Sequence, residues 1–181
     1  FMNWASQNGV DKPAFTNIGR WRVDEMAHKH AEVYVPWLTI DVDHQDITEA
    51  YRHAANGTTR LMELGYDPDR VVCSFSGKKG FHVQIDTSQM GMPVFADATA
   101  ASIFIRHFTE DVFDQGWDPA VFATRSLIRL TGSTHSETGL RKRSFFAEDF
   151  LAKNLSGVMR GTRKAITPFT WPSRGEPLPE P

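Results

Sequence analysis

The sequence predicts an α+β fold, in which a mostly antiparallel sheet carries helices on one face. Runs of β-branched and aromatic residues predict strands, and two longer stretches with apolar residues at helical spacing predict helices. A five-residue turn with glycine near both ends, residues 76–80, joins two of the strands as a hairpin. The resulting order β-α-β-β-α-β is that of a split βαβ, RNA-recognition-like sheet, whose helix-free face can carry a site.

The first predicted strand covers residues 33–43, with Pro36 expected near its beginning or at an edge. A helix should follow from residue 47, because Asp46 and the glutamate three positions later match an acidic capping box. Gly65 is expected to end this helix, and Gly57 could mark a break within it.

The second and third strands are predicted at residues 71–75 and 81–86, on either side of the turn. The elements expected after them are a helix at 95–113, a short strand at 126–130, a polar loop at 131–139, a strand at 141–146 and a helix at 147–163. Before the first strand, residues 1–30 are expected to form a loop and a short helix.

The chain of 181 residues is expected to form one domain over residues 1–166, followed by a proline-rich extended segment at 167–181. Its only cysteine, Cys73, can make no disulfide within the chain and no zinc site by itself, so no structural zinc is expected. No stretch is apolar enough to span a membrane, and no secretory signal is recognisable. Charge is uneven: residues 119–181 hold 10 Lys and Arg against 5 Asp and Glu, a basic region that could meet phosphates or simply be solvated.

Two carboxylates lie at the end of the first predicted strand. Because side chains of a strand alternate between faces, Asp41 and Asp43 share one face with Trp37 and Thr39. Carboxylates this close repel each other unless a cation relieves them, and oxygen ligands suit Mg²⁺ or Mn²⁺. The alternative is a strand-end pair that points into water.

The turn after the second strand reads Ser76-Gly77-Lys78-Lys79-Gly80-Phe81-His82. Glycines allow the backbone to approach a ligand closely, and the hydroxyl and lysines can donate to phosphate oxygens. The alternative is a hairpin tip with solvated lysines and a packed histidine. Further along the chain, Arg129 lies on an apolar strand and therefore needs an anionic partner, either a protein carboxylate or a phosphate.

Taken in order, these segments resemble the catalytic core of the archaeo-eukaryotic primase superfamily over about residues 37–143. Its first motif, an apolar strand ending in Asp-x-Asp, matches residues 39–43, and its Ser-Gly-x-x-Gly-x-His motif matches residues 76–82. A hydrophobic residue followed by an acid matches Trp117-Asp118, although Asp114 is a second candidate acid. Residues 127–140, Leu-Ile-Arg-Leu-Thr-Gly-Ser-Thr-His-Ser-Glu-Thr-Gly-Leu, are similar to a segment of primase small subunits, with Thr131 in place of the usual proline.

The resemblance implies a set of roles. Asp41, Asp43 and Asp118 would be the catalytic acids and would hold two Mg²⁺ or Mn²⁺ ions. The residues implied to bind the nucleotide phosphates are Ser76, Lys78, Lys79, His82, Arg129 and His135. Lys142 and Arg143 would contact the backbone of a nucleic acid. The cysteine-rich zinc knob of many primase small subunits is missing, which favours a phage, plasmid or mobile-element version.

The implied function is template-directed nucleotide transfer by a primase or primase-polymerase. Its expected partners are single-stranded DNA, NTP or dNTP, and a helicase domain in the same or another chain. Its expected location is the cytoplasm of a prokaryotic or phage-infected cell. A nucleic-acid-binding initiator module without catalysis is the main alternative. A haloacid-dehalogenase-type phosphohydrolase fits less well, because that family has Thr or Val where this chain has Gln45 and uses a parallel sheet.

Overall fold

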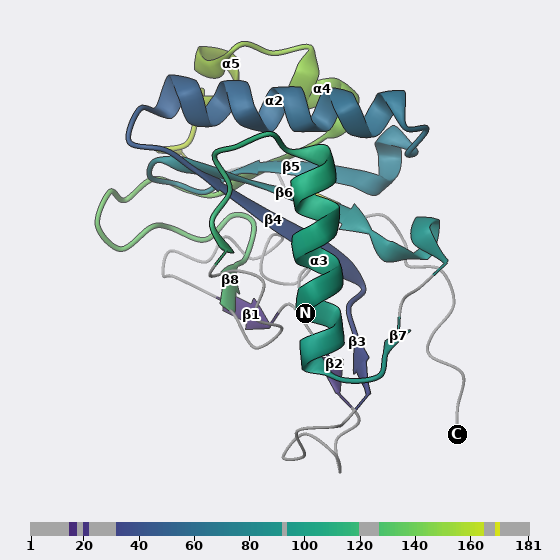
Figure 1. The fold of residues 1–181 in the computed structure, drawn as a ribbon. Coiled ribbons are helices and arrows are strands. Elements are labelled where there is room, and N and C mark those ends of the chain that lie inside the picture. The colour runs from purple at the N-terminus through teal and green to yellow at the C-terminus, as the bar shows by residue number, and fades with distance from the viewer. Residues whose placement is uncertain are drawn as a thin grey trace.

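A four-stranded antiparallel sheet forms the centre of the chain in the computed structural model, which describes residues 15–17, 20–21, 32–91, 94–119, 127–164 and 169–170. The strand order is β4-β6-β5-β9 (Figure 1). The bounds of these strands are Trp37–Asp43 for β4, Gly80–Asp86 for β6, Val71–Phe75 for β5 and Arg143–Phe146 for β9.

The split βαβ arrangement is confirmed by the pairing of the first three of these strands. Strands β4 and β5 are joined by helix α2, Ile47–Glu63, and lie on opposite sides of β6, each antiparallel to it. Strand β9 extends the sheet beyond β5. The other edge is met by residues 116–118: Val42 forms a bridge with Trp117, and the Asp118 N–H donates to the Asp41 carbonyl at 2.8 Å.

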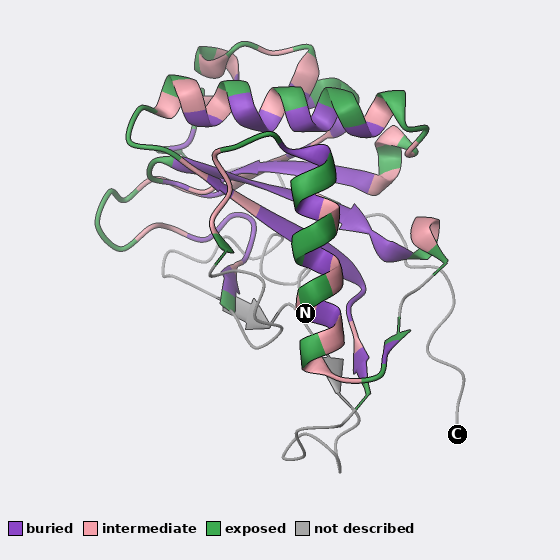
Figure 2. Cartoon of the chain, viewed as in Figure 1, coloured by how far each residue is buried: buried purple, intermediate pink, exposed green. Residues whose placement is uncertain are grey.

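Helices cover one face of the sheet, and the core lies between them. Alternate strand residues such as Leu38, Ile40 and Phe81 are fully buried under α2, α3 (Ala98–Val112) and the short helix α4 (Ala147–Leu151). Figure 2 shows α2 buried on its sheet-facing side and exposed on the other. This is the amphipathic pattern that its sequence predicts.

Helix α2 begins where the sequence predicts, because the Asp46 carboxylate accepts a hydrogen bond from the Thr48 N–H at 2.8 Å. Gly65 follows the helix with φ of +86°, a backbone conformation that favours glycine. The expected break at Gly57 does not occur. A Cβ at this position would lie 2.0 Å from Cε1 of Phe113, so the glycine makes room for an aromatic ring while the helix stays continuous.

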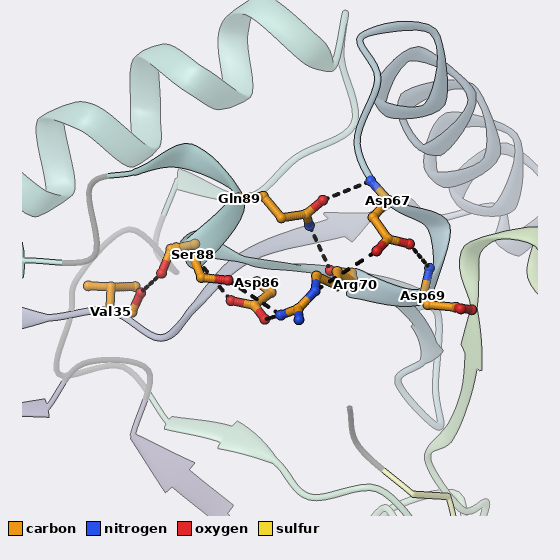
Figure 3. Close-up of polar contacts among 8 residues, drawn as sticks. Val35, Asp67, Asp69, Arg70, Asp86, Ser88 and Gln89 are labelled. Carbon is orange, nitrogen blue, oxygen red and sulfur yellow. Dashed lines mark hydrogen bonds and ion pairs between the residues drawn. The ribbon is translucent and has the colours of Figure 1, made fainter. Parts of the chain in front are cut away.

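A polar network fixes the end of the sheet where β6 finishes, at Asp86 (Figure 3). Arg70, in the 3₁₀ turn Pro68–Arg70, donates to the Asp86 carboxylate at 2.6 Å. Gln89, in the 3₁₀ turn Thr87–Met90, accepts from the Asp67 N–H at 2.7 Å. These contacts tie together the two connections at this end, which leaves the opposite end, at Asp43 and Gly80, for the candidate site.

Several element boundaries differ from the sequence prediction. The strand expected over residues 33–43 is two strands, β3 (Val33–Tyr34) and β4, interrupted at Pro36. The helix expected over 147–163 is two short ones, α4 and α5 (Leu155–Met159), because Asn154 caps a new helix start. Helix α3 begins three residues later than expected, after β7 (Val94–Phe95).

Two smaller sheets lie beside the central one. Strand β1 (Phe15–Asn17) pairs with β8 (Leu127–Arg129), and β3 lies between β2 (Arg20–Trp21) and β7. Strands β1 and β2 were not predicted; the short helix expected in residues 1–30 and most of the proline-rich segment lie outside the described residues. In the part of the chain that the structure describes, no helix is long and apolar enough to cross a lipid bilayer.

Candidate functional site

Three aspartates lie near one another at the Asp43 end of β4. Asp41 and Asp43 are on this strand, and the bridge between Val42 and Trp117 brings Asp118 alongside them. The other candidate acid, Asp114, instead lines a cleft of about 500 Å³ beside α2, together with His53. None of the predicted site residues lines that cleft.

The environment of Asp41 is unfavourable for a negative charge. Burial, then repulsion from Asp43 and from Asp118, raises the pKa of Asp41 from 3.8 to about 7, and the cations of Lys142 and Lys79 only partly oppose this. The side chain is still 21% exposed, so an ion can reach it. Unrelieved repulsion among acids is the situation that a bound divalent cation would remove.

Asp43 is positioned by the turn that precedes β6. Its carboxylate pairs with the ammonium of Lys79 at 3.0 Å. Gly80 lies directly opposite in the sheet register, and a Cβ there would be 2.1 Å from Oδ1 of Asp43. A glycine is therefore required at this position for the carboxylate to lie where it does. The ion pair with Asp43 also raises the pKa of Lys79.

The donor set fits a hard divalent cation in its chemistry, since carboxylate oxygens are the ligands that Mg²⁺ and Mn²⁺ prefer. Among the described residues, however, no three His, Cys, Asp or Glu side chains already form a group able to hold a metal. Lys79 pairs with Oδ2 of Asp43, so a metal bound through this oxygen would compete with the lysine.

The turn from Ser76 to Gly80 lies next to two residues that are distant in sequence. Gly77 has φ of +98°, and a Cβ on it would lie 2.9 Å from Nη1 of Arg129 and 3.2 Å from Cβ of His135. The Arg129 guanidinium donates to the Ser76 carbonyl at 2.6 Å. The structure thus brings together the turn, the arginine and the histidine that the sequence singled out.

Arg129 is half-buried and has no carboxylate within ion-pair distance among the described residues. Burial lowers the pKa of Arg129, while the charge of Asp41 opposes that shift. A guanidinium held near an aspartate but unpaired with it is suited to receive an anion. The sequence left two possible anionic partners for Arg129, a protein carboxylate and a phosphate. The described residues do not provide the carboxylate.

The lysines of the turn point to different partners. Lys78 forms an ion pair with Glu137, and both side chains are well exposed. Thr138, one residue later, donates to the Gly77 carbonyl at 2.5 Å and so fixes the loop of residues 131–139 against the turn. Sequence reasoning missed Glu137 and Thr138, because nothing in a polar loop indicates which turn it will contact.

His82 lies in the middle of the site-bearing face, paired in register with Asp41 on one side and with Ser74 on the other. Its Nε2 is 3.5 Å from Oδ1 of Asp41. Burial, with the charges of Lys142 and Arg129, lowers the pKa of His82 well below its ordinary value, so this imidazole is neutral at physiological pH. Hydroxyls of Ser74, Ser144 and Thr131, also not foreseen, form a hydrogen-bonded row beside it.

The structure corrects the role expected for Lys142. This side chain is only 1% exposed, and its ammonium lies 2.8 Å from Nδ1 of His82. A lysine buried this way cannot contact the backbone of a nucleic acid. Arg143 pairs with Phe75 in register and is therefore on the helix-bearing face, where its guanidinium lies 5.0 Å from the ring of Phe145. It is partly exposed, and its expected contact stays a prediction.

Comparison with known proteins gives a likeness of fold. No protein-family model matches the sequence, and no curated protein matches it. A similar solved structure is the polymerase domain from Mycobacterium tuberculosis Ligase D in complex with DNA, with a TM-score of 0.51 and 12% sequence identity. The match covers 81% of this chain and 56% of that one, so this chain spans little more than half of its neighbour's length. The likeness agrees with the predicted α+β fold of antiparallel sheet and flanking helices.

Proposed function

We propose that this protein is a template-directed nucleotidyltransferase that joins nucleotides from nucleoside triphosphates, a primase or primase-polymerase. The observation that carries the proposal is the division of one sheet end into an acidic and a cationic half. Asp41, Asp43 and Asp118 form the first half, and the turn at Gly77 with Arg129 lies beside them. Such a division suits a substrate that carries both a triphosphate and metal ions.

The acidic half would hold two Mg²⁺ or Mn²⁺ ions, which would activate the attacking 3′-hydroxyl and neutralise the leaving pyrophosphate. The chain itself contributes three carboxylates whose mutual repulsion favours cation binding. No nucleophilic side chain is needed for this reaction, because the acceptor strand supplies the hydroxyl. Cys73 does not offer one, since it is buried in the core and burial raises the pKa of its thiol to about 12.

The cationic half would bind the triphosphate. Arg129 can donate to phosphate oxygens without leaving a protein carboxylate, and the Ser76 hydroxyl and the turn backbone are beside it. Lys78, Lys79 and His135 would add charge or donors once phosphates compete with their present partners. His82 would complete the contact between the two halves, because it lies between Asp41 and the buried Lys142.

The nucleic-acid partner and the biological setting are part of the same proposal. We propose single-stranded DNA as the template; the structural neighbour is a polymerase domain in complex with DNA, which supports a nucleic-acid partner in general. The resemblance in sequence motifs supports replication of a phage, plasmid or mobile element as the setting.

A nucleotide-incorporation assay tests the proposal. The purified protein is given single-stranded DNA with NTP or dNTP, and with Mg²⁺ or Mn²⁺, with and without an annealed primer. Wild-type protein should form products that Asp41→Ala and Asp43→Ala do not form. Asp114→Ala is the matched control, because this acid lies in the separate cleft, and it should keep activity. Equal activity of the wild type and the Asp41 variant would overturn the proposal.

A second candidate is a nucleic-acid-binding module without catalysis. The observation in its favour is that the described acids do not already form a metal-holding group and that Lys79 neutralises Asp43. Measuring single-stranded DNA binding in parallel with incorporation separates the two. DNA binding by wild-type protein, with no incorporation under any of the metal and nucleotide conditions, would favour the module.

A further inference from the structure

Lys142 is an ionisable side chain that the proposed reaction does not use directly. It lies between β8 and β9, and its backbone is held by two hydrogen bonds: its N–H donates to the Ser133 carbonyl, and its carbonyl accepts from the Gly132 N–H. The side chain runs into the protein and is 1% exposed. Burying an ammonium is unfavourable, and together with the nearby charge of Arg129 it lowers the pKa of Lys142 from 10.5 to about 7, while the charge of Asp41 opposes that shift. Its partners should therefore explain what the side chain does there.

The ammonium has two partners among the described residues. It donates to the Arg129 carbonyl at 2.9 Å, and it lies 2.8 Å from Nδ1 of His82. An ammonium has three N–H donors and no acceptor, so a ring nitrogen at hydrogen-bond distance from it must accept. Nδ1 of His82 therefore carries no proton when Lys142 is charged.

The other ring nitrogen faces the opposite kind of group. Nε2 of His82 is 3.5 Å from Oδ1 of Asp41, within ion-pair distance, and the ionised carboxylate of Asp41 can only accept a hydrogen bond. A neutral imidazole has one protonated nitrogen. The Lys142 contact at Nδ1 and the Asp41 contact at Nε2 therefore favour the same tautomer, in which Nδ1 is bare and Nε2 is protonated. Register places His82 directly opposite Asp41, and the ring lies between Lys142 at Nδ1 and Asp41 at Nε2.

We propose that Lys142 is a positioning residue that holds His82 in its Nε2–H tautomer, with the N–H directed toward the acidic end of the sheet. The assignment of the tautomer stands on the contacts of His82 with Lys142 and Asp41 alone. Its use in presenting a donor to the triphosphate rests on the proposed function. Lys142 acts through His82 and, being buried, does not itself meet the nucleotide.

The position also explains why lysine suits this place. The stem of the side chain can be buried while a single ammonium reaches both the Arg129 carbonyl and His82. By bonding the backbone of Arg129, the same group couples the placement of the phosphate-binding arginine to that of the histidine. One buried side chain thus orders two of the residues expected to meet phosphates.

Nitrogen-15 NMR of histidine-labelled protein tests the assignment, because protonated and bare ring nitrogens have well-separated shifts. His82→Gln identifies the His82 signals among the seven histidines. In wild-type protein without metal or nucleotide, Nε2 should be protonated and Nδ1 bare. In Lys142→Met, which keeps the apolar stem, His82 should become a mixture of tautomers. Lys142→Arg should restore the wild-type pattern, since it restores a donor. Lys153→Met, a lysine substitution after α4, is the matched control and should change nothing.

Calorimetric binding of Mn²⁺ with a nucleoside triphosphate is the second readout. Lys142→Met should weaken nucleotide binding about 10- to 100-fold, by analogy with the loss of a group that orients a metal-ligating histidine. A protonated Nδ1 in the wild type, or an unchanged tautomer in a folded Lys142→Met protein, would overturn the inference. Both outcomes can be read even if no nucleotide binds. Failure of the wild type to bind nucleotide with the expected tautomer intact would count against the proposed function alone.

Discussion

Replacing Asp41 by Asn should stabilise the protein in the absence of metal while removing its proposed activity. The reason is that Asp41 is held where its charge is unfavourable, by burial and by repulsion from Asp43 and Asp118. Asparagine keeps the shape of the side chain and its ability to hydrogen-bond, but it carries no charge. Most substitutions of partly buried residues destabilise a protein, so a gain in stability here is a distinctive expectation.

The magnitude follows from the pKa of Asp41, which rises from 3.8 in its ordinary state to about 7 in the folded protein. Each pH unit between the folded and unfolded pKa corresponds to about 1.4 kcal/mol. At about pH 8 the ionised carboxylate therefore costs on the order of 4 kcal/mol, an upper estimate that asparagine would relieve in part. For a chain of this size, 1 kcal/mol shifts Tm by about 2–4 °C, so Asp41→Asn should raise Tm by roughly 5–15 °C.

The sign of the pH dependence is fixed by the direction of the shift. The folded protein binds the Asp41 proton more tightly than the unfolded chain, so the associated stability is fully present below pH 3.8 and is lost as the pH rises to about 7. The variant has no such proton. The difference in unfolding free energy between Asp41→Asn and wild type should therefore grow from pH about 4 to about 7 and then level off.

Urea unfolding of both proteins across this pH range, with a chelator present, measures the difference. Asp114→Asn serves as the control for loss of a carboxylate elsewhere and should not show the same trend. Added Mn²⁺ should stabilise the wild type and leave Asp41→Asn almost unchanged. The reasoning is refuted if Asp41→Asn is no more stable than wild type at about pH 8, or if the difference does not depend on pH.

Three further substitutions test how the site is built. Gly57→Ala should lower the free energy of unfolding in urea by about 1–3 kcal/mol, because the added Cβ would enter the Phe113 ring. An increase of about 1 kcal/mol in this free energy, as helix propensity alone predicts, would show that the ring moves freely. Gly80→Ala should displace the Asp43 carboxylate and abolish stabilisation by Mn²⁺, as followed by thermal unfolding, and unchanged stabilisation by Mn²⁺ would count against Asp43 as a ligand. Arg129→Met should weaken Mn²⁺-dependent nucleotide binding by about 1.5–3 kcal/mol, the net value of a hydrogen bond to a charged group. Circular dichroism should show that the variant keeps its folded structure. Wild-type affinity in this variant would exclude the arginine from the phosphate site.

The sequence was informative wherever a local pattern determines the outcome. The strand ending at Asp43, the capped start of α2 at Asp46 and the hairpin through Gly77 follow from side-chain alternation, capping and turn chemistry, and each is present in the structure. The grouping of Arg129 with that hairpin came only from the resemblance of ordered motifs, because residues 53 positions apart have no local relation.

What could not be predicted depends on contacts between distant segments. A glycine within a predicted helix indicates a break. Only the position of the Phe113 ring explains why a glycine occurs at residue 57 of a continuous helix. Lys142 lies among arginines in a basic stretch, and its burial follows from the strand register that turns it toward His82. Asp118 was expected near Asp41 only from the resemblance of ordered motifs. Its proximity depends on a backbone bridge between Val42 and Trp117, from a segment after α3, and no local sequence pattern predicts that bridge.

The central claim is that the acidic and cationic halves form one site for a metal-bound nucleoside triphosphate. Isothermal titration of a nucleoside triphosphate into the wild-type protein, with Mn²⁺ or with a chelator, tests it most directly. The account predicts binding that requires Mn²⁺ and is lost separately in Asp41→Ala, from the acidic half, and in Arg129→Met, from the cationic half. Nucleotide binding of equal strength with and without the metal, or binding that survives both substitutions, would contradict it.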